Sequence, residues 1–307
     1  MVKPSVMADL QRWGPDSPAL EVSRQEAEDY CRSLALSHYE NFPVASILLP
    51  RALHQHFYNV YAFCRWADDL GDESGSPERA AALLNWWQAE LDFCFAGKPR
   101  HPVFVALWPT IQEFELPQEP FDDLISAFQQ DQVVREYETF EQLLDYCTRS
   151  ANPVGRIVLG LVRRLNDRTA NWSDSICTGL QLANFWQDVA RDDAIGRIYL
   201  PREDRERFGV TPERFAERRT TPEFAALMQF EVDRARQFLL AGTPLVAHMP
   251  GRLKVEIDLF RRGGLLILDA IEQAKYRVWE RRPTIPKSRF LTEALKSLLL
   301  TPFSKPV

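Results

Sequence analysis

Apolar side chains recur along most of this chain at intervals of three and four residues, which is the period of an amphipathic helix. Strict alternation of apolar and polar residues, with the Asn-Gly or Asp-Gly turns that join hairpin strands, is absent. Ser23 and Glu26 have the spacing of a capping box, and Pro77 begins a helical run that stops at Gly97. The pattern therefore predicts an all-α fold.

The predicted helices share this period and are separated by short breaks. They cover residues 22–40, 53–70, 77–97, 103–115, 121–136, 140–150, 154–166, 174–192, 224–241, 252–281 and 289–300. No internal repeat, low-complexity segment or long linker divides them. We therefore expect a single domain over residues 1–307, preceded by an irregular N-terminal arm over residues 1–20.

Composition narrows the class of protein. Of 307 residues, 45% are hydrophobic and 26% are charged, with a net charge of −6, as in an ordinary globular domain. The acidic balance disfavours a nucleic-acid binder, and no Gly-rich phosphate loop is present. Five scattered cysteines, never in a Cys-x-x-Cys pair, indicate reduced thiols. Neither a signal peptide nor a membrane-spanning run is visible. We expect a cytoplasmic protein, and peripheral contact with the inner face of the membrane stays open.

Candidate chemistry concentrates in two helical segments that each carry a pair of aspartates four residues apart. The spacing places both carboxylates of a pair on one helix face, one turn apart. Further polar residues extend each row by whole turns. The first row is Tyr61, Arg65, Asp68 and Asp72, and the second row is Gln181, Asn184, Asp188 and Asp192.

Like charges one turn apart repel, and carboxylates beside apolar helix surface must be paired or bind cations. Two facing carboxylate pairs suit Mg²⁺, which binds through one or two carboxylates together with waters and substrate phosphates. The rows therefore indicate a diphosphate held by bridging metal ions. Salt-bridged surface charge remains an alternative interpretation of the same residues.

The motifs resemble those of the head-to-head isoprenoid synthases, which comprise squalene, dehydrosqualene and phytoene synthases. The resemblance extends from His38 to Arg282 and rests on four elements. They are the segments 68–72 and 188–192, the Gly-Arg-Ile-Tyr-Leu-Pro segment 196–201, and a tyrosine, Tyr146, followed nine residues on by Gly155. Segments 41–46, 150–155 and 181–188 look like one branch of the family, the bacterial hydroxysqualene synthases of hopanoid biosynthesis.

The resemblance implies an isoprenoid-synthase-type helical bundle with a central apolar cavity. It implies an enzyme, a carbon–oxygen lyase, that ionises presqualene diphosphate and captures the carbocation with water to give hydroxysqualene. The cofactor would be Mg²⁺, with Mn²⁺ able to replace it, and no NADPH is expected. A prenyl transferase that condenses two prenyl diphosphates is the first alternative. A non-catalytic member of the fold is the second, and it is disfavoured because all four aspartates are present.

Site residues carry over by matching the family's motifs. Asp68, Asp72, Asp188 and Asp192, with Asn184, would hold the metal. The residues implied to contact diphosphate or to line its pocket are His38, Tyr61, Arg65, Gln181, Asn184, Arg197 and Arg281. Tyr146 matches a tyrosine near the reacting carbons, and Tyr146 and Asn152 are the candidates for positioning the attacking water.

Two positions depart from the family pattern. Gln187 stands where some relatives carry arginine, directly before the first aspartate of the second motif. Gly264 stands where relatives often carry tyrosine in a late helix. Both departures indicate an altered environment for the cation or the diphosphate. Gly263 and Gly264 could line a substrate tunnel or allow close helix packing.

Overall fold

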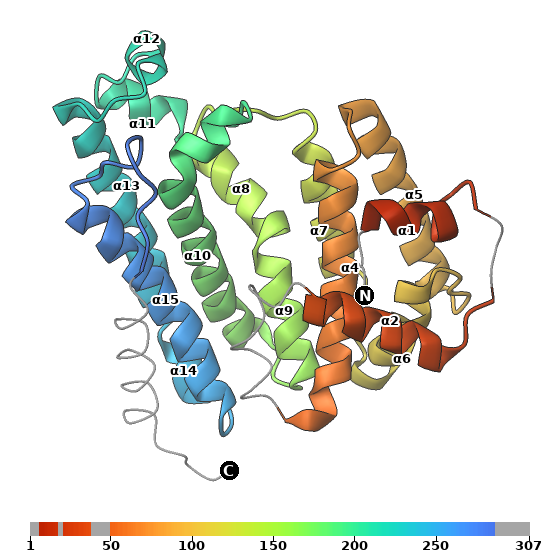
Figure 1. Cartoon of the computed structure of the whole chain (residues 1–307). Helices are drawn as coiled ribbons and strands as arrows, with labels where there is room; N and C mark the ends of the chain where they lie inside the picture. The colour runs from red at the N-terminus through yellow and green to blue at the C-terminus, as the bar shows by residue number, and fades with distance from the viewer. Residues whose placement is uncertain (1–5, 18–20, 38–49, 286–307) are drawn as a thin grey trace. The chain divides into compact units, whose positions relative to one another are not determined.

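The structure, a computed structural model, describes residues 6–17, 21–37 and 50–285. These residues form helices joined by loops, with no strand beyond an isolated parallel bridge between Glu136 and Ile198 (Figure 1). The predicted all-α fold is confirmed. The chain divides into two compact units, one made of residues 1–133 with 157–164 and the other of residues 134–156 with 165–307.

The first unit is built around an aromatic core. Its elements are α1 (Val6–Trp13), α2 (Arg24–Ser37), η1 (Arg51–Leu53), α4 (His54–Asp72), α5 (Pro77–Phe95), α6 (Pro102–Phe114) and α7 (Glu119–Gln130). Trp66 of α4 stacks on Trp87 of α5 with ring centroids 5.2 Å apart. Phe63 of α4 packs edge-on against Phe121 of α7 at 5.1 Å. These buried rings fix the apolar face of α4, the helix that carries the first aspartate pair.

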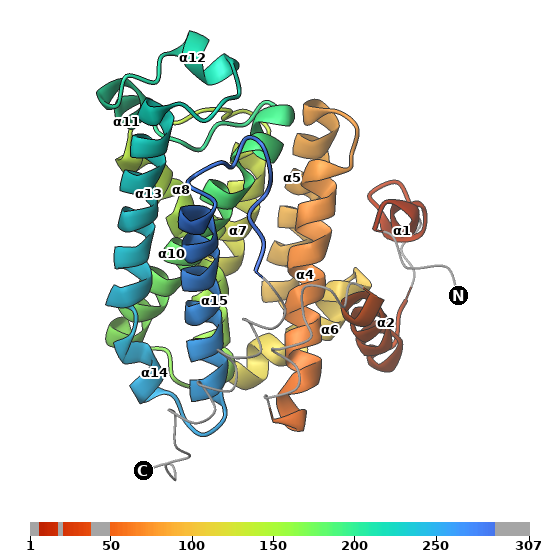
Figure 2. The ribbon, with the colours of Figure 1, turned by 60° about the vertical axis from the view of Figure 1, so that its left-hand side comes forward.

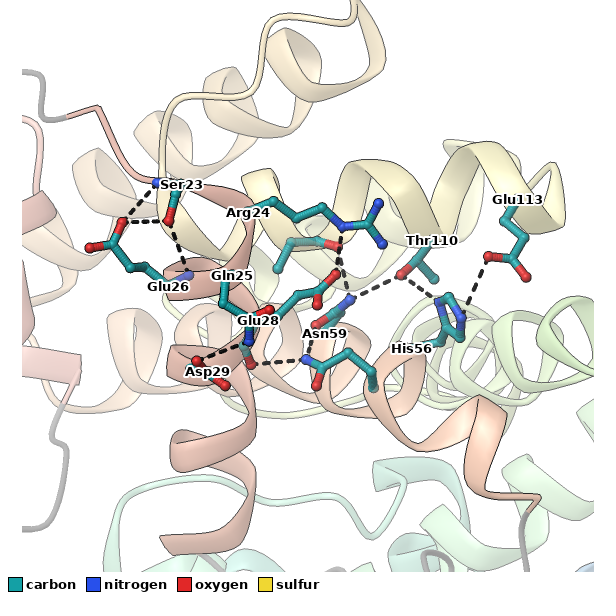
Figure 3. A network of polar contacts seen from close by, with 12 residues as sticks. Ser23, Arg24, Gln25, Glu26, Glu28, Asp29, His56, Asn59, Thr110 and Glu113 are labelled. Carbon is teal, nitrogen blue, oxygen red and sulfur yellow. Dashed lines mark hydrogen bonds and ion pairs between the residues drawn. The ribbon is translucent and has the colours of Figure 1, made fainter.

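Polar contacts fix the N-terminal half of α4 as well (Figure 3). The buried Asn59 side chain donates to the carbonyl of Ala106 at 2.8 Å and to Thr110 Oγ1 at 3.1 Å, both on α6. Gln55 donates to the carbonyl of Glu28 on α2 at 2.9 Å. Because an unmade buried hydrogen bond is costly, these bonds hold α4 in place between α2 and α6.

The second unit carries the second aspartate pair on its longest helix. Its elements are α8 (Phe140–Ser150), α10 (Asp167–Ala194), α11 (Arg202–Arg207), α12 (Pro212–Ala216), α13 (Pro222–Ala241), α14 (Pro244–His248) and α15 (Leu253–Gln273), and α9 (Asn152–Leu161) is shared with the first unit. Helices α10, α13 and α15 run side by side (Figure 2). Trp186 of α10 is fully buried, and its indole N–H donates to the carbonyl of Glu231 on α13 at 3.1 Å.

The helix ends are set by capping residues and backbone conformation and do not coincide with the ends of the apolar period. The predicted capping box is confirmed, since Glu26 N donates to Ser23 Oγ at 3.3 Å and Ser23 N donates to Glu26 Oε2 at 3.0 Å (Figure 3). Helix α10 begins before residue 174 because the Asn166 side chain accepts two backbone N–H bonds, at 3.1 Å each. Helix α15 ends before residue 281 because Lys275 and Tyr276 adopt φ values of 55° and 59°.

The N-terminal arm differs from its expectation. Residues Val6–Trp13 form α1, whereas an irregular arm was predicted over residues 1–20. Val6 is buried, and Trp13 packs edge-on against Tyr30 of α2 with ring centroids 4.6 Å apart. Val6, Leu10 and Trp13 have the i, i+4, i+7 spacing of one helix face, so a periodic signal was present but was overlooked in a segment of only eight residues. The helix predicted over residues 289–300 lies outside the described residues, and the single domain stays a prediction.

Within residues 6–17, 21–37 and 50–285, no helix is both long enough and apolar enough to span a bilayer.

Candidate functional site

The first polar row lies on the C-terminal half of α4, as its spacing predicts. Tyr61, Arg65 and Asp68 are partly exposed, and Asp72, at the helix end, is exposed. The guanidinium of Arg65 lies 3.4 Å from Asp68 Oδ2. Partial burial raises the pKa of the Tyr61 phenol, which keeps it protonated. This face therefore presents a cation, two carboxylates and a hydroxyl from one helix.

Asp69 is a part of this site to which the sequence analysis assigned no role. Its carboxylate is buried and forms a close ion pair with Arg65, four residues earlier on α4. Burial raises the pKa of Asp69 to about 7, opposed by the Arg65 charge. Asp69 therefore anchors the guanidinium of Arg65. The i,i+4 spacing of the two residues was the available signal.

The second row lies on the C-terminal half of α10. Gln181 is partly exposed, Asn184 is exposed and Asp188 is buried. Both carboxylate oxygens of Asp188 accept hydrogen bonds from Arg282, at 2.6 Å from Nε and 2.8 Å from Nη2. Arg282 is a site residue that the sequence analysis missed, because 94 residues separate it from its partner.

Asp192, one turn beyond Asp188, has a different environment. Its Oδ2 atom is buried and accepts no hydrogen bond from the described residues. Burial raises the pKa of Asp192 to about 7, and the Asp188 charge adds to the shift, while the nearby arginines Arg197, Arg191 and Arg282 oppose it. A carboxylate that is desolvated, repelled by its neighbour and incompletely hydrogen bonded is suited to binding a cation.

Arg197 lies beside Asp192, as the resemblance implies for two residues of one site. Its backbone N–H donates to the carbonyl of Asp192 at 2.8 Å. Gly196 makes this return of the chain possible, because its φ of 75° lies in the left-handed region. Asp192 and Arg197 line one small cavity together with Phe185 and Tyr199. This cavity joins an anionic and a cationic group to an aromatic wall.

Tyr146 of α8 packs near two aromatic residues of that cavity, Phe185 and Tyr199. It is buried, and its ring centroid lies 6.3 Å from that of Phe185 and 6.1 Å from that of Tyr199. Phe185 and Tyr199 stack at 3.7 Å. Asn152, at the start of α9, is also buried, and its Oδ1 accepts a hydrogen bond of 3.0 Å from Thr178 of α10. Both predicted water-positioning residues therefore lie in the same unit as the second aspartate pair.

Three predictions for the site are not supported by contacts among the described residues. Arg281 is exposed, and its side chain makes no ion pair with the part of the chain that the structure describes. His38 lies outside the described residues. The two aspartate rows belong to different units, so their convergence on one substrate stays a prediction.

The donor set fits a hard divalent cation. Each row offers two carboxylates, and hard cations take oxygen ligands. No three His, Cys, Asp or Glu side chains of residues 6–17, 21–37 and 50–285 gather as a ready-made cluster. Mg²⁺ characteristically takes only one or two carboxylates and completes its shell with water and phosphate oxygens. The buried Oδ2 of Asp192, which has no hydrogen-bond donor among the described residues, is the observation that favours such a ligand.

Comparison with known proteins gives concordant matches. Residues 35–289 match the profile of the squalene/phytoene synthase family. A 15-cis-phytoene synthase from a Synechocystis species is 32% identical over 305 residues, covering 94% of this chain and 89% of the relative.

Solved structures agree with this assignment. The squalene synthase HpnC from Alicyclobacillus acidocaldarius is 46% identical, with a TM-score of 0.79, and covers 84% of this chain and 97% of its own. A dehydrosqualene synthase solved with a ligand is 25% identical, with a TM-score of 0.81, and covers 90% of this chain and 97% of its own. The resemblance drawn from the motifs is confirmed.

Proposed function

The chain belongs to the squalene/phytoene synthase family, whose enzymes act on prenyl diphosphates, and we propose that it converts presqualene diphosphate into hydroxysqualene and diphosphate. The 46% identity to the squalene synthase HpnC, against 32% to the phytoene synthase of Synechocystis, favours a squalene-type over a phytoene-type reaction. The choice of hydroxysqualene within that group is carried by the resemblance of segments 41–46, 150–155 and 181–188. The departures at Gln187 and Gly264 also favour a reaction other than condensation of two substrates.

The proposed reaction begins with departure of the diphosphate. The carbon–oxygen bond breaks with its electron pair on the diphosphate oxygen, leaving a cyclopropylcarbinyl cation. Bound Mg²⁺ would neutralise the charge that develops on the leaving group. Asp68, Asp72, Asp188, Asp192 and Asn184 are the proposed holders of that ion. Arg65, held by Asp69, and Arg197, beside Asp192, supply fixed positive charge for the same anion.

Aromatic faces protect the cation while it rearranges. Tyr146, Phe185 and Tyr199 form a buried cluster in the unit that holds the second aspartate pair. An aromatic face stabilises a desolvated cation by about 2 kcal/mol. We propose that the prenyl chains occupy a central apolar cavity, because long hydrocarbons bind in enclosed apolar sites.

Water then completes the reaction. Its oxygen forms the new carbon–oxygen bond, and its released proton passes to the diphosphate. Tyr146 and Asn152 are the proposed residues that orient this water. The Thr178 hydroxyl holds Asn152 Oδ1 at 3.0 Å, which fixes the direction of the Asn152 amide. The reaction balances with water alone, so the proposal includes no reductant.

A direct comparison of substrates tests the proposal. Purified protein and Mg²⁺ are incubated without NADPH in separate tubes with presqualene diphosphate, farnesyl diphosphate and geranylgeranyl diphosphate. The proposal expects an alcohol from presqualene diphosphate and no consumption of the other two. Turnover of farnesyl or geranylgeranyl diphosphate alone would establish a condensing synthase instead, the function that the phytoene synthase relatives favour.

A further inference from the structure

Arg282 binds the carboxylate of Asp188 in a forked geometry. Its Nε and Nη2 atoms each donate to a different oxygen, at 2.6 Å and 2.8 Å. Two parallel bonds of this kind form the strongest type of arginine–carboxylate pair. Arg191 also lies near Asp188, but at 3.6 Å and with its side chain 68% exposed, against 34% for Arg282. Arg282 is therefore the principal counter-ion of Asp188.

Gln187 holds Arg282 in this position. Its Oε1 accepts a bond of 2.8 Å from Arg282 Nη2, and its Nε2 donates to the carbonyl of Pro283 at 2.6 Å. Gln187 is buried, and both ends of its amide are used, so the amide has one favoured orientation. An arginine at position 187 would offer no acceptor and would repel Arg282. The departure noted in the sequence thus has a specific structural role.

The two aspartates of α10 are consequently in opposite states. Asp188 has both oxygens bonded to a cationic side chain, whereas Asp192 has a buried oxygen with no donor among the described residues. A divalent cation that approaches this pair meets one open ligand and one occupied by a guanidinium. The positive charge of Arg282 opposes binding of the second cation to the same carboxylate.

We propose that Gln187 and Arg282 form a counter-ion latch on Asp188, which makes binding of the divalent cation depend on diphosphate. This inference rests on the metal and diphosphate site of the proposed function. Diphosphate supplies the negative charge that offsets the electrostatic repulsion between Arg282 and the divalent cation. Metal alone therefore binds weakly, and metal with diphosphate binds well. By linkage, the cation raises the affinity for diphosphate by the same factor.

The test is calorimetric titration of the full chain with Mg²⁺, with and without inorganic pyrophosphate. Arg282→Gln removes the guanidinium fork. The latch predicts that this variant binds Mg²⁺ alone about tenfold more tightly than the unaltered chain. It also predicts that pyrophosphate improves Mg²⁺ affinity less in the variant, by the same factor. A gain in metal affinity is a result that a merely damaged structure does not produce.

Two further variants sharpen the result. Arg191→Gln removes one positive charge beside the same carboxylate and is the matched control, with Mg²⁺ affinity expected within twofold of the original. Gln187→Met removes the holder and is expected to change Mg²⁺ affinity in the same direction as Arg282→Gln, but less. The double variant is expected to resemble Arg282→Gln alone, because both changes release one latch.

The latch is overturned if Arg282→Gln leaves the affinity for Mg²⁺ alone unchanged or weakens it. It is equally overturned if the unaltered chain binds no Mg²⁺ in the presence of pyrophosphate. These outcomes are separable from failure of the proposed function, because neither titration requires turnover. If the chain makes hydroxysqualene but Arg282→Gln does not increase Mg²⁺ affinity, only the latch is contradicted. If Arg282→Gln increases Mg²⁺ affinity but the chain makes no alcohol, only the proposed reaction is contradicted.

Discussion

At the scale of single residues, the carboxylate of Asp192 combines properties that seldom occur together in a merely structural group. One oxygen is buried without a donor among the described residues, and its pKa is raised to about 7 by burial and by Asp188. Bare burial of a carboxylate costs stability, so a role in binding explains its presence better than a role in folding.

We predict that Asp192→Asn lowers kcat for presqualene diphosphate at least about 100-fold, because the variant loses a charged ligand of the metal–diphosphate assembly. Asp193→Asn is the matched control. The adjacent Asp193 pairs with Arg218 at 2.7 Å, and we expect its loss to alter kcat less than threefold. Steady-state kinetics at saturating Mg²⁺ measure both. Equal losses in the two variants would remove Asp192 from the site.

Glu256 of α15 predicts a pH dependence of stability. Its side chain is buried with Oε2 unpartnered among the described residues, and burial raises its pKa from 4.5 to about 8. The folded state thus holds a proton that the unfolded state releases above pH 4.5. The contribution of Glu256 is fully present below that pH and is lost as pH rises toward 8.

We therefore expect Glu256→Gln, which keeps the neutral shape, to be more stable than the unaltered chain at pH 8, by at least about 1 kcal/mol. The two should converge near pH 5. Glu272→Gln, at a site 59% exposed, is the control and should leave the profile unchanged. Denaturant titrations between pH 5 and 8 measure the difference. Parallel profiles for all three proteins would contradict the assignment.

At the scale of helices, the second unit depends on close approach between α15 and its neighbours. A Cβ atom at Gly264 would lie 2.8 Å from Leu180 Cδ2 and 2.9 Å from Leu239 Cδ1. At Gly263 it would meet nothing within 4 Å. Of the two interpretations of this glycine pair, close packing therefore applies to Gly264.

This pair predicts opposite effects for the same substitution at adjacent positions. Gly264→Ala should destabilise the protein by about 1–3 kcal/mol, because Leu180 and Leu239 must shift. Gly263→Ala should stabilise it by about 0.5–1 kcal/mol, through the higher helix propensity of alanine. Thermal unfolding of both variants provides the comparison. A stabilising Gly264→Ala would show that the interhelical contact is looser than described.

The existence of the longer helices followed from the sequence, whereas the short helices α1, α11, α12 and α14 were not predicted. Helix ends followed only where the cap was recognised. The Ser23–Glu26 box was found because glutamate stands three residues after serine, whereas the cap at Asn166 was overlooked because threonine, Thr169, stands at the corresponding position. Helix α15 ends where Lys275 and Tyr276 adopt left-handed conformations, which these residue types rarely adopt and which the sequence therefore does not indicate.

At the scale of the whole molecule, the sequence predicts those parts of the site that lie on a single helix. The aspartate pairs, Arg65 and Asn184 share helix faces, and spacing alone places them there. Arg282 joins Asp188 through the tertiary fold, and no spacing rule gives that contact. The resemblance indicated Arg281, which is one residue away from the arginine that makes the ion pair.

We propose that the two units unfold as one domain, as the sequence predicts. The chain passes between them more than once, and α9 has residues in both. Loss of either unit would then remove one end of α9 and destabilise the other. Scanning calorimetry should show a single transition with equal van't Hoff and calorimetric enthalpies. Two resolved transitions would contradict a single cooperative domain.

In the proposed reaction, water captures a carbocation formed from presqualene diphosphate, and isotopic labelling identifies the source of the oxygen. The protein, Mg²⁺ and presqualene diphosphate are incubated in ¹⁸O-labelled water without NADPH, and the extracted products are analysed by mass spectrometry. We predict an alcohol that carries ¹⁸O at the new carbinol. An alcohol whose oxygen is unlabelled, or folded protein that consumes none of this substrate, would contradict it.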